Sequence, residues 1–356
     1  MTVLYGDGIH DDYQAIQGML DSGLSVIKLN KPKVKYIISK TLKIHTGQTL
    51  KMPKKALISL MDNANCVMLE NDDFEKWSSN ITIIGGIWDM NHDNQRPNPY
   101  HFSDENGELT PEKYKKKNLP KMFDKFYDIY TGTCIRFCRV NNLLFKNVTI
   151  RNPVTYGIHV GHLNGFVFKD IFFDFFEGSP KLWNMDGLHI SGSCKNGKII
   201  NIHGTCHDDM LAFTTDLEQE DIVGGIDNIV VNGIHGEHTH SAVRILSRKS
   251  PITNISITNI TGSYYVYCIG FTKYVANDTY GIMDNISINK VSASSCEGTN
   301  DVTWHYPFIW IEGGLKIKSL SLSNIERIIT DINVPFIQID QNVILEGFVA
   351  KNISEK

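Results

Sequence analysis

Short runs of alternating hydrophobic and polar residues recur along the chain from about residue 140. Alternation directs the isoleucine, valine and leucine side chains to one face of a strand. Most runs close on asparagine, which suits a corner because it tolerates the left-handed backbone conformation. The runs occupy residues 147–152, 196–201, 228–232, 254–259, 285–289 and 319–324, with a similar run at 165–170 in the widest gap. The pattern predicts a repeated unit of strand and corner.

A second set of short apolar strands lies between these runs, so each repeat holds at least two strands. This set covers residues 187–190, 210–213, 242–246, 268–271 and 308–311. No amphipathic helix separates the strands, which argues against alternating strands and helices. Repeats that start roughly 26 to 49 residues apart are typical of a solenoid. We therefore predict an all-β protein, a single-stranded parallel β-helix. The alternative, a β-sandwich, requires hairpin turns every 8 to 12 residues or so.

The N-terminal part of the chain departs from the repeat. Residues 13–21 carry apolar side chains at helical spacing, and Asp11 and Asp12 precede them in the position of an N-terminal cap. A short capping helix within about residues 1–30 would cover the open end of the first coil. Residues 92–132 break the repeat with proline, lysine and aromatic residues, and we interpret them as a loop excursion. The prediction is one domain over residues 1–356.

Composition and charge restrict the possible partners. The 356 residues are 42% hydrophobic and 21% charged, as in a folded globular protein. Their 35 basic and 39 acidic residues give no overall attraction to nucleic acid or to a membrane surface. No run is long enough to span a membrane and no signal peptide begins the chain, so the location is either cytoplasmic or secreted with the leader removed. Seven scattered cysteines favour buried thiols over a disulfide framework.

Three aspartates carry the chemistry that the sequence suggests. Asp186 precedes one strand, and the pair Asp208 and Asp209 precedes a strand that starts about one coil later. Stacked coils would bring the three carboxylates together on one exterior face. Like-charge repulsion would then raise at least one pKa, which keeps a general acid protonated near neutral pH. Glycoside hydrolysis needs such a pair of carboxyl groups, one to protonate the leaving oxygen and one to activate water or attack the sugar.

Several segments resemble glycoside hydrolase family 28, the polygalacturonase group. Asn-Met-Asp-Gly at 184–187 is similar to the family's Asn-Thr-Asp-Gly motif, and His-Asp-Asp-Met-Leu-Ala at 207–212 is similar to its Gly-Asp-Asp-Cys-x-Ala motif. Ala-Val-Arg-Ile-Leu at 242–246 resembles its Gly-Val-Arg-Ile-Lys strand. Residues 7–16 and 85–89 resemble segments of pectin-lyase-like β-helices. The resemblance implies a right-handed β-helix.

The resemblance also implies a role for each motif residue. Asp208 would be the general acid, Asp186 and Asp209 would hold and activate the water, and Arg244 would bind substrate. The reaction would invert the configuration of the anomeric centre. The sequence departs from the family at two places. Leu246 stands where the family has lysine, and the family's Gly-His-Gly histidine has no clear counterpart, with His235, His238 and His240 as candidates.

Further side chains near these motifs are candidates for substrate binding, namely His189, His207, His240, Trp183 and Tyr267. The histidines lack the spacing of zinc ligands, so we predict no metal and no cofactor. The expected partner is a carbohydrate, with self-association possible. A polysaccharide lyase of the same fold and a trimeric sugar-binding spike or adhesin are the alternatives. The sugar, its linkage and the choice between internal and terminal cleavage stay open.

Overall fold

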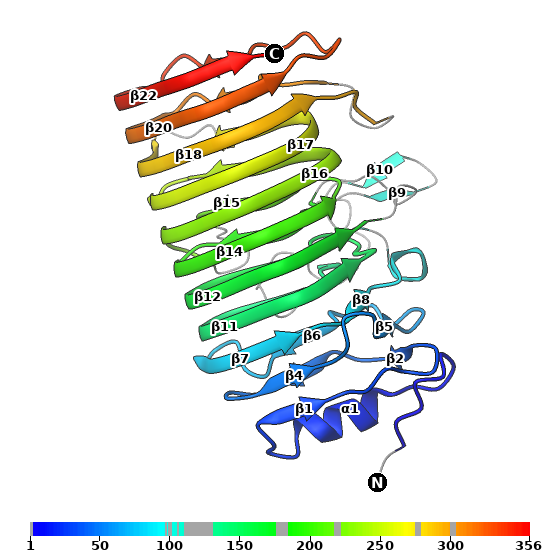
Figure 1. Ribbon diagram of the computed structural model, residues 1–356. Helices are drawn as coiled ribbons and strands as arrows, with labels where there is room; N and C mark the ends of the chain where they lie inside the picture. Colours follow the sequence, from blue (N-terminus) through cyan, green and yellow to red (C-terminus); the bar gives the residue numbers. More distant parts are fainter. Residues whose placement is uncertain are drawn as a thin grey trace. The chain divides into compact units, whose positions relative to one another are not determined.

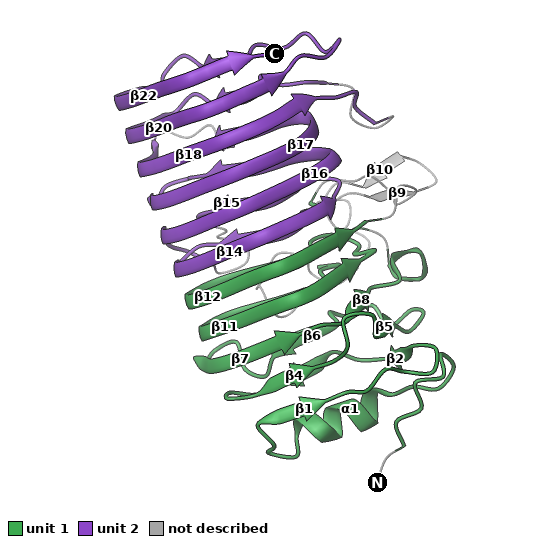
Figure 2. Ribbon diagram, in the orientation of Figure 1, with its two compact units in different colours: residues 1–185 green, residues 186–356 purple. Residues whose placement is uncertain are grey.

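The computed structural model describes residues 3–96, 98, 102–104, 107–109, 131–175, 184–216, 222–274, 279–299 and 304–356. The chain divides into two compact units, residues 1–185 and 186–356 (Figure 2). In each unit the strands follow one another as stacked coils (Figure 1). The single domain expected over the whole chain stays a prediction.

Unit 1 begins with the one α-helix among the described residues, α1, at the place that the sequence predicts. Its elements are α1 (Tyr13–Leu20), β1 (Val26–Lys28), β2 (Tyr36–Ile38), β3 (Leu42–Ile44), β4 (Thr49–Lys51), β5 (Leu57–Leu60), β6 (Leu69–Asn71), β7 (Ser78–Ile84), β8 (Ile87–Asp89), a 3-10 helix (His92–Asn94), β9 (Phe102–Asp104), β10 (Gly107–Leu109), β11 (Ile135–Arg151) and β12 (Ile158–Asp174). Most of the excursion predicted at 92–132 lies outside the described residues.

Unit 2 contains the longer strands. They are β13 (Leu188–Ser191), β14 (Cys194–Thr205), β15 (Asp209–Thr214), β16 (Ile226–Leu246), β17 (Ile252–Thr272), β18 (Gly281–Ser295), β19 (Ile309–Ile311), β20 (Leu315–Ile328), β21 (Ile337–Ile339) and β22 (Ile344–Glu355). Strands β16 and β17 each join two of the predicted strands. Every pairing given for the described strands of unit 2 is parallel. A β-sandwich, which is built from antiparallel strands, is therefore excluded.

Asparagine corners and apolar stacks explain why this sequence coils. Asn254 and Asn285 both adopt positive φ, and the Asn285 amide donates to the Asn254 side-chain oxygen at 2.7 Å. Inside the coils, Ile255 pairs with Ile286, which in turn pairs with Leu320. These three side chains are essentially fully buried. Each contributes about 2 kcal/mol by leaving water. The corner role that the sequence predicts for asparagine is confirmed.

The two aspartates before α1 have different roles: the Asp11 carboxylate accepts the N–H of Tyr13, the first helical residue, at 2.9 Å, as the sequence predicts, whereas Asp12 does not. Asp12 occupies the N-cap position of α1, but its side chain makes no capping hydrogen bond to the helix. Its buried carboxylate instead accepts the backbone N–H groups of Tyr5, at 2.6 Å, and of Gly6. It also accepts the N–H of Ile37 in β2, at 3.3 Å. The carboxylate thus links the N-terminal loop to a coil strand. Its oxygens bind the N–H groups of that loop and of β2 instead of the N–H groups of the helix.

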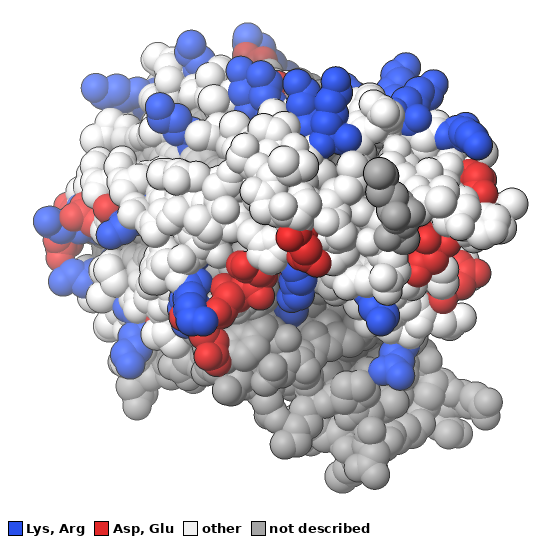
Figure 3. Space-filling view, turned by 90° about the horizontal axis from the view of Figure 1, so that it is seen from below, with Lys and Arg blue, Asp and Glu red and all other residues white. Residues whose placement is uncertain are grey.

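The surface and the cysteines agree with the composition. Figure 3 shows charged side chains of both signs on one face, with Lys and Arg gathered along one side and Asp and Glu in smaller groups. No described helix has both the length and the apolar character that crossing a membrane requires. All seven cysteines are free thiols and five of them are buried, as expected for small apolar core residues.

Candidate functional site

The parallel register of unit 2 brings the three aspartates together. Leu188 of β13 pairs with Leu211 of β15, and the N–H of Gly187 donates to the Asp209 carbonyl at 2.9 Å. Asp186 is therefore level with Asp209 on the neighbouring coil. The backbone N–H of Asp209 donates to Asp186 Oδ1 at 3.3 Å. The spacing of the two motifs in the sequence thus corresponds to one turn of the coil.

Two of the three carboxylates are fully enclosed. Asp186 and Asp209 are 0% exposed and Asp208 is 8% exposed. The sequence predicts an exterior face, and that expectation of surface carboxylates is wrong. The side chains of His189, Arg244 and Tyr267 lie against Asp186 and Asp209. Side chains from the same coil and from later coils therefore take these groups out of water.

Arg244 lies between the two buried carboxylates. Its Nε is 2.9 Å from Asp209 Oδ2, and its Nη2 is 3.8 Å from Asp186 Oδ2. In the register, Ala212 stands between His189 and Arg244. The small alanine side chain leaves the guanidinium room to reach past β15. The resemblance implies a substrate-binding arginine, whereas this guanidinium contacts the two carboxylates and lies 5.8 Å from the centroid of the Tyr274 ring.

Burial dominates the proton affinities in the cluster. Burial raises the pKa of Asp209 to about 7, with Arg244 opposing the rise and the neighbouring carboxylates adding to it. The pKa of Asp186 is held well above its usual range by burial and by the charge of Asp208, with Arg244 again opposing. A single guanidinium cannot neutralise several carboxylates. The cluster therefore retains a proton at neutral pH.

His189 is paired with Asp186. Its Nδ1 lies 2.5 Å from Asp186 Oδ2, and both side chains are buried. Burial and the nearby charge of Arg244 lower the pKa of His189 to about 3. A neutral imidazole in this position fixes the orientation of the Asp186 carboxyl. The sequence marks His189 for substrate binding, but only 2% of it is exposed.

A histidine and two tyrosines line the other side of the carboxylates. His240 Nδ1 lies 3.6 Å from Asp208 Oδ1 and 2.6 Å from the Ser241 hydroxyl. The Tyr267 hydroxyl donates to Asp209 Oδ1 at 3.2 Å. The ring of Tyr265 packs edge-on to His240, with the centroids 5.5 Å apart. Of the predicted substrate-binding residues, His240 and Tyr267 therefore lie at the carboxylates, as Arg244 and His189 do.

The remaining predicted residues have different surroundings. His207 is buried before β15, and its carbonyl accepts the Tyr265 hydroxyl at 3.4 Å. Trp183 lies outside the described residues. His235 is half-exposed and contacts Thr261 and Glu237. Among the three histidines considered for the family's Gly-His-Gly position, His240 is the one with described contacts to the carboxylates.

One group of side chains has the composition of a cation site. Asp208, Asp209 and His240 each offer one ligand atom, and these atoms all lie within 4.8 Å of one another. Two carboxylates and an imidazole suit a divalent cation. The guanidinium of Arg244, 2.9 Å from Asp209, already provides a positive charge there and would compete with the ion.

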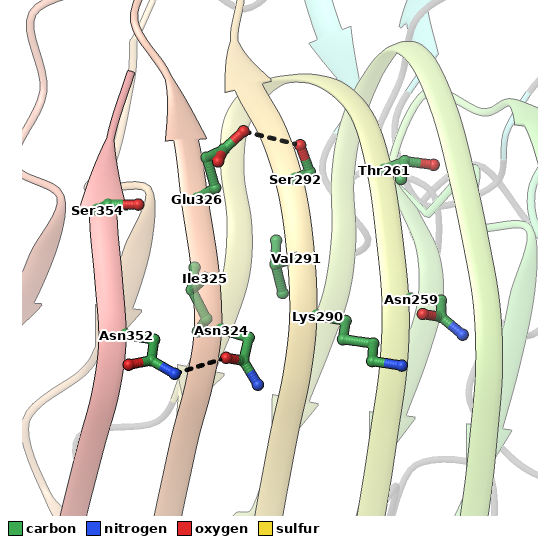
Figure 4. A pocket seen from close by; sticks show the side chains of 10 residues that line it. All are labelled: Asn259, Thr261, Lys290, Val291, Ser292, Asn324, Ile325, Glu326, Asn352 and Ser354. Carbon is green, nitrogen blue, oxygen red and sulfur yellow. Dashed lines mark hydrogen bonds between the residues drawn. The ribbon is translucent and has the colours of Figure 1, made fainter.

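A hollow elsewhere in unit 2 is lined by other residues. It has a volume of about 450 Å³ and lies across β17, β18, β20 and β22 (Figure 4). Its lining is mostly polar and comprises Asn259, Thr261, Lys290, Val291, Ser292, Asn324, Ile325, Glu326, Asn352 and Ser354. The Asn352 amide donates to the Asn324 side-chain oxygen at 2.8 Å. This groove follows the asparagine corners and contains none of the candidate residues.

Comparison with known proteins identifies the fold. No protein-family model matches the chain, and no curated protein matches it. An endo-xylogalacturonan hydrolase from Aspergillus tubingensis is similar in structure, with a TM-score of 0.69 and 14% identity over 99% of this chain and 91% of that chain. An exopolygalacturonase from Thermotoga maritima has a TM-score of 0.65 and 16% identity over 96% and 89%. PfbA, a surface adhesin of Streptococcus pneumoniae, has a TM-score of 0.52 and 13% identity over 99% and 91%.

The chain has the right-handed parallel β-helix fold. At these identities the likeness establishes the fold alone, and the chemistry has to be argued from the side chains of this β-helix. Sequence reasoning missed three of them. Ser241 is in register with Asp209, Gly270 is in register with Arg244, and Tyr274 places its ring 5.8 Å from the Arg244 guanidinium. The number of residues per coil varies along the chain, so only the register of the folded coils could have revealed the first two.

Proposed function

We propose that the protein is a glycoside hydrolase that cleaves a polysaccharide or an oligosaccharide at Asp186, Asp208 and Asp209. The observation that carries this proposal is the convergence of three aspartates from two adjacent coils: Asp186 and Asp209 meet at the buried Arg244, and an oxygen of Asp208 lies within 4.8 Å of one of Asp209. Burying carboxyl groups beside one another costs free energy. Such an arrangement is expected in an enzyme whose reaction needs one acid and one base within reach of the same bond.

Each carboxyl group has a position that suits one role. Asp208 is the most exposed of the three, so it can reach the oxygen of a glycosidic bond and protonate it. Asp186 and Asp209 hold and activate the attacking water. Arg244 favours their ionised forms. The negative charge of the cluster also stabilises the positive charge that develops on the sugar in the transition state.

Inversion of the anomeric centre rests on the family resemblance. Inverting enzymes usually hold their two carboxyl groups about 6.5–9.5 Å apart, with room for water. Here an oxygen of Asp208 lies within 4.8 Å of an oxygen of Asp209. NMR of the anomer first released decides the stereochemistry, and a retained configuration would overturn this part of the proposal.

The test is hydrolysis of a saccharide panel by the wild type and by two matched variants. Asp208→Asn keeps the size of the side chain and removes the proton donor, and we expect kcat to fall by about 100-fold or more. Asp284→Asn is the control, because Asp284 lies on β18 of the same unit and forms an ion pair with Lys318, with Oδ2 and Nζ 3.2 Å apart. The control should keep full activity. Full activity in Asp208→Asn would refute the assignment of the acid.

The cation-site geometry of Asp208, Asp209 and His240 favours one alternative, a polysaccharide lyase that uses a divalent ion. A lyase forms a double bond, so its products absorb in the ultraviolet and a chelator abolishes the activity. Hydrolysis that resists chelators and gives no such absorbance excludes the lyase. Saccharide binding without any turnover would instead indicate a spike or an adhesin.

A further inference from the structure

A group of aromatic side chains continues from the carboxylates onto the next coils of unit 2. Gly270 and Trp310 follow Arg244 in the same row of paired positions, one on β17 and one on β19. The step from Arg244 to Trp310 is two strand spacings, or about 10 Å. The row therefore leads from the buried acids to an indole ring on the same side of the sheet.

Gly270 makes space for the ring that joins the two ends of this row. A Cβ atom at Gly270 would lie 2.8 Å from the Tyr267 ring, closer than real Cβ contacts allow. Without that atom, the Tyr267 ring leans over the row. Its hydroxyl binds Asp209 at 3.2 Å and its ring centroid lies 6.3 Å from that of Trp310. Tyr267 thus contacts the acids and the aromatic group at the same time.

Tyr306 and Trp310 form a pre-organised pair. Their rings stack with centroids 4.4 Å apart and planes 19° apart. The Trp310 indole N–H donates to Asp340 Oδ2 at 2.9 Å, which fixes the rotation of that ring. Tyr306 is 37% exposed. Aromatic rings that are already fixed lose little entropy when a ligand stacks on them.

The charges around the pair indicate which sugar suits it. Asp340 places a carboxylate at the indole, and the acid cluster lies beyond Tyr267. The one guanidinium in the row, that of Arg244, is between Asp209 and Asp186. A uronate carboxylate beside the aromatic pair would meet like charge, whereas the C–H face of a neutral sugar would meet an apolar ring.

We propose that Tyr306 and Trp310 form a stacking subsite for an uncharged pyranose of the saccharide that the acids cleave. The inference rests on the proposed hydrolase function and adds the class of sugar. Because the two rings cover each other's inner faces, the pyranose would stack on the outer face of Tyr306, which is 37% exposed, with Trp310 supporting that ring from behind. The rest of the saccharide would then follow the row of Gly270 and Arg244 toward the acids.

Binding to an inactive enzyme tests the subsite separately from turnover. In an Asp208→Asn background, hexasaccharides of β-1,4-linked xylose, galactose and glucose are titrated by calorimetry and tryptophan fluorescence, with a hexagalacturonide as the charged comparison. Tyr306→Ala should weaken binding of the preferred neutral hexasaccharide about tenfold, as expected for the loss of one stacked ring. Tyr306→Phe keeps the ring and should bind within about twofold of the parent. Trp77→Ala, at an exposed tryptophan of unit 1, is the control.

The outcomes separate the two proposals. Unchanged binding by Tyr306→Ala, or tighter binding of the hexagalacturonide than of every neutral probe, would overturn the subsite. If the wild type hydrolyses a saccharide while no neutral probe binds the inactive enzyme, the subsite fails and the hydrolase stands. If nothing in the panel binds or is cleaved, both proposals fail.

Discussion

Replacing Asp209 by asparagine should remove a dependence of stability on pH that the buried acid cluster creates. The pKa of Asp209 is raised from 3.8 to about 7, chiefly by burial. The folded state therefore binds a proton more tightly than the unfolded state. The stability from this group is fully present below pH 3.8 and is lost as the pH rises toward 7. Over roughly three pH units, at about 1.4 kcal/mol each, the loss amounts to about 4 kcal/mol.

The asparagine variant lacks this loss. A protonated carboxyl and an amide have similar size and hydrogen-bonding capacity, so wild type and Asp209→Asn should have similar free energies of unfolding at pH 4. The variant should then gain on the wild type as the pH rises, by up to about 4 kcal/mol at pH 8. Asp186 shares the cluster, so the measured difference belongs to the coupled pair. The variant is also expected to lose hydrolysis.

Urea unfolding at several pH values between 4 and 8 provides the assay, with the denaturant slope checked for constancy. Asp227→Asn on β16 is the control. Hydrogen bonds from Thr253 and Asn254 lower the pKa of Asp227, so its contribution is present above its ordinary pKa and is lost only at lower pH. The control should therefore be destabilised by a nearly constant amount from pH 5 to 8. A difference between Asp209→Asn and wild type that does not grow with pH would refute the burial argument.

Two further predictions concern protonation. Asp209, whose pKa is raised to about 7 by burial, should lose its activity as a base below that pH, so kcat/KM should fall as the pH decreases below 7. A flat profile from pH 5 to 8 would contradict the role of this carboxylate. Near α1, the His45 ring lies 2.7 Å from Asp72 and 2.8 Å from Asp21. Burial lowers the pKa of His45, but the hydrogen bonds to the two carboxylates outweigh the effect of burial, so the pKa is raised. The stability that His45 contributes is present below its unfolded pKa of about 6.5 and is lost above its folded pKa. His45→Gln should therefore destabilise the protein by about 1 kcal/mol at pH 6 and by less at pH 9, as measured by urea unfolding. An equal effect at both pH values would count against the ion pairs.

Local pattern carried much of the fold in the sequence. The alternation of Ile255 and Ile257 with polar neighbours marks a strand with one buried face, and Asn254 marks its corner. Both patterns extend over only a few residues, so they can be recognised in the sequence without knowledge of the rest of the fold. The separation of the two motifs also placed Asp186 beside Asp209, because β13 and β15 are joined by one coil.

The tertiary structure decided which groups lie around those acids and how deeply they are buried. The register joins Asp209 to Ser241 and Ser241 to Tyr267, and these two steps differ in length along the chain. Sequence spacing therefore could not predict that Tyr267 binds Asp209, or that His240, rather than His235, lies at Asp208. Burial, and with it the raised pKa values, depends on side chains supplied by several coils at once. The sequence alone thus determined that a cluster of acids exists, and the stacking of the coils set its environment.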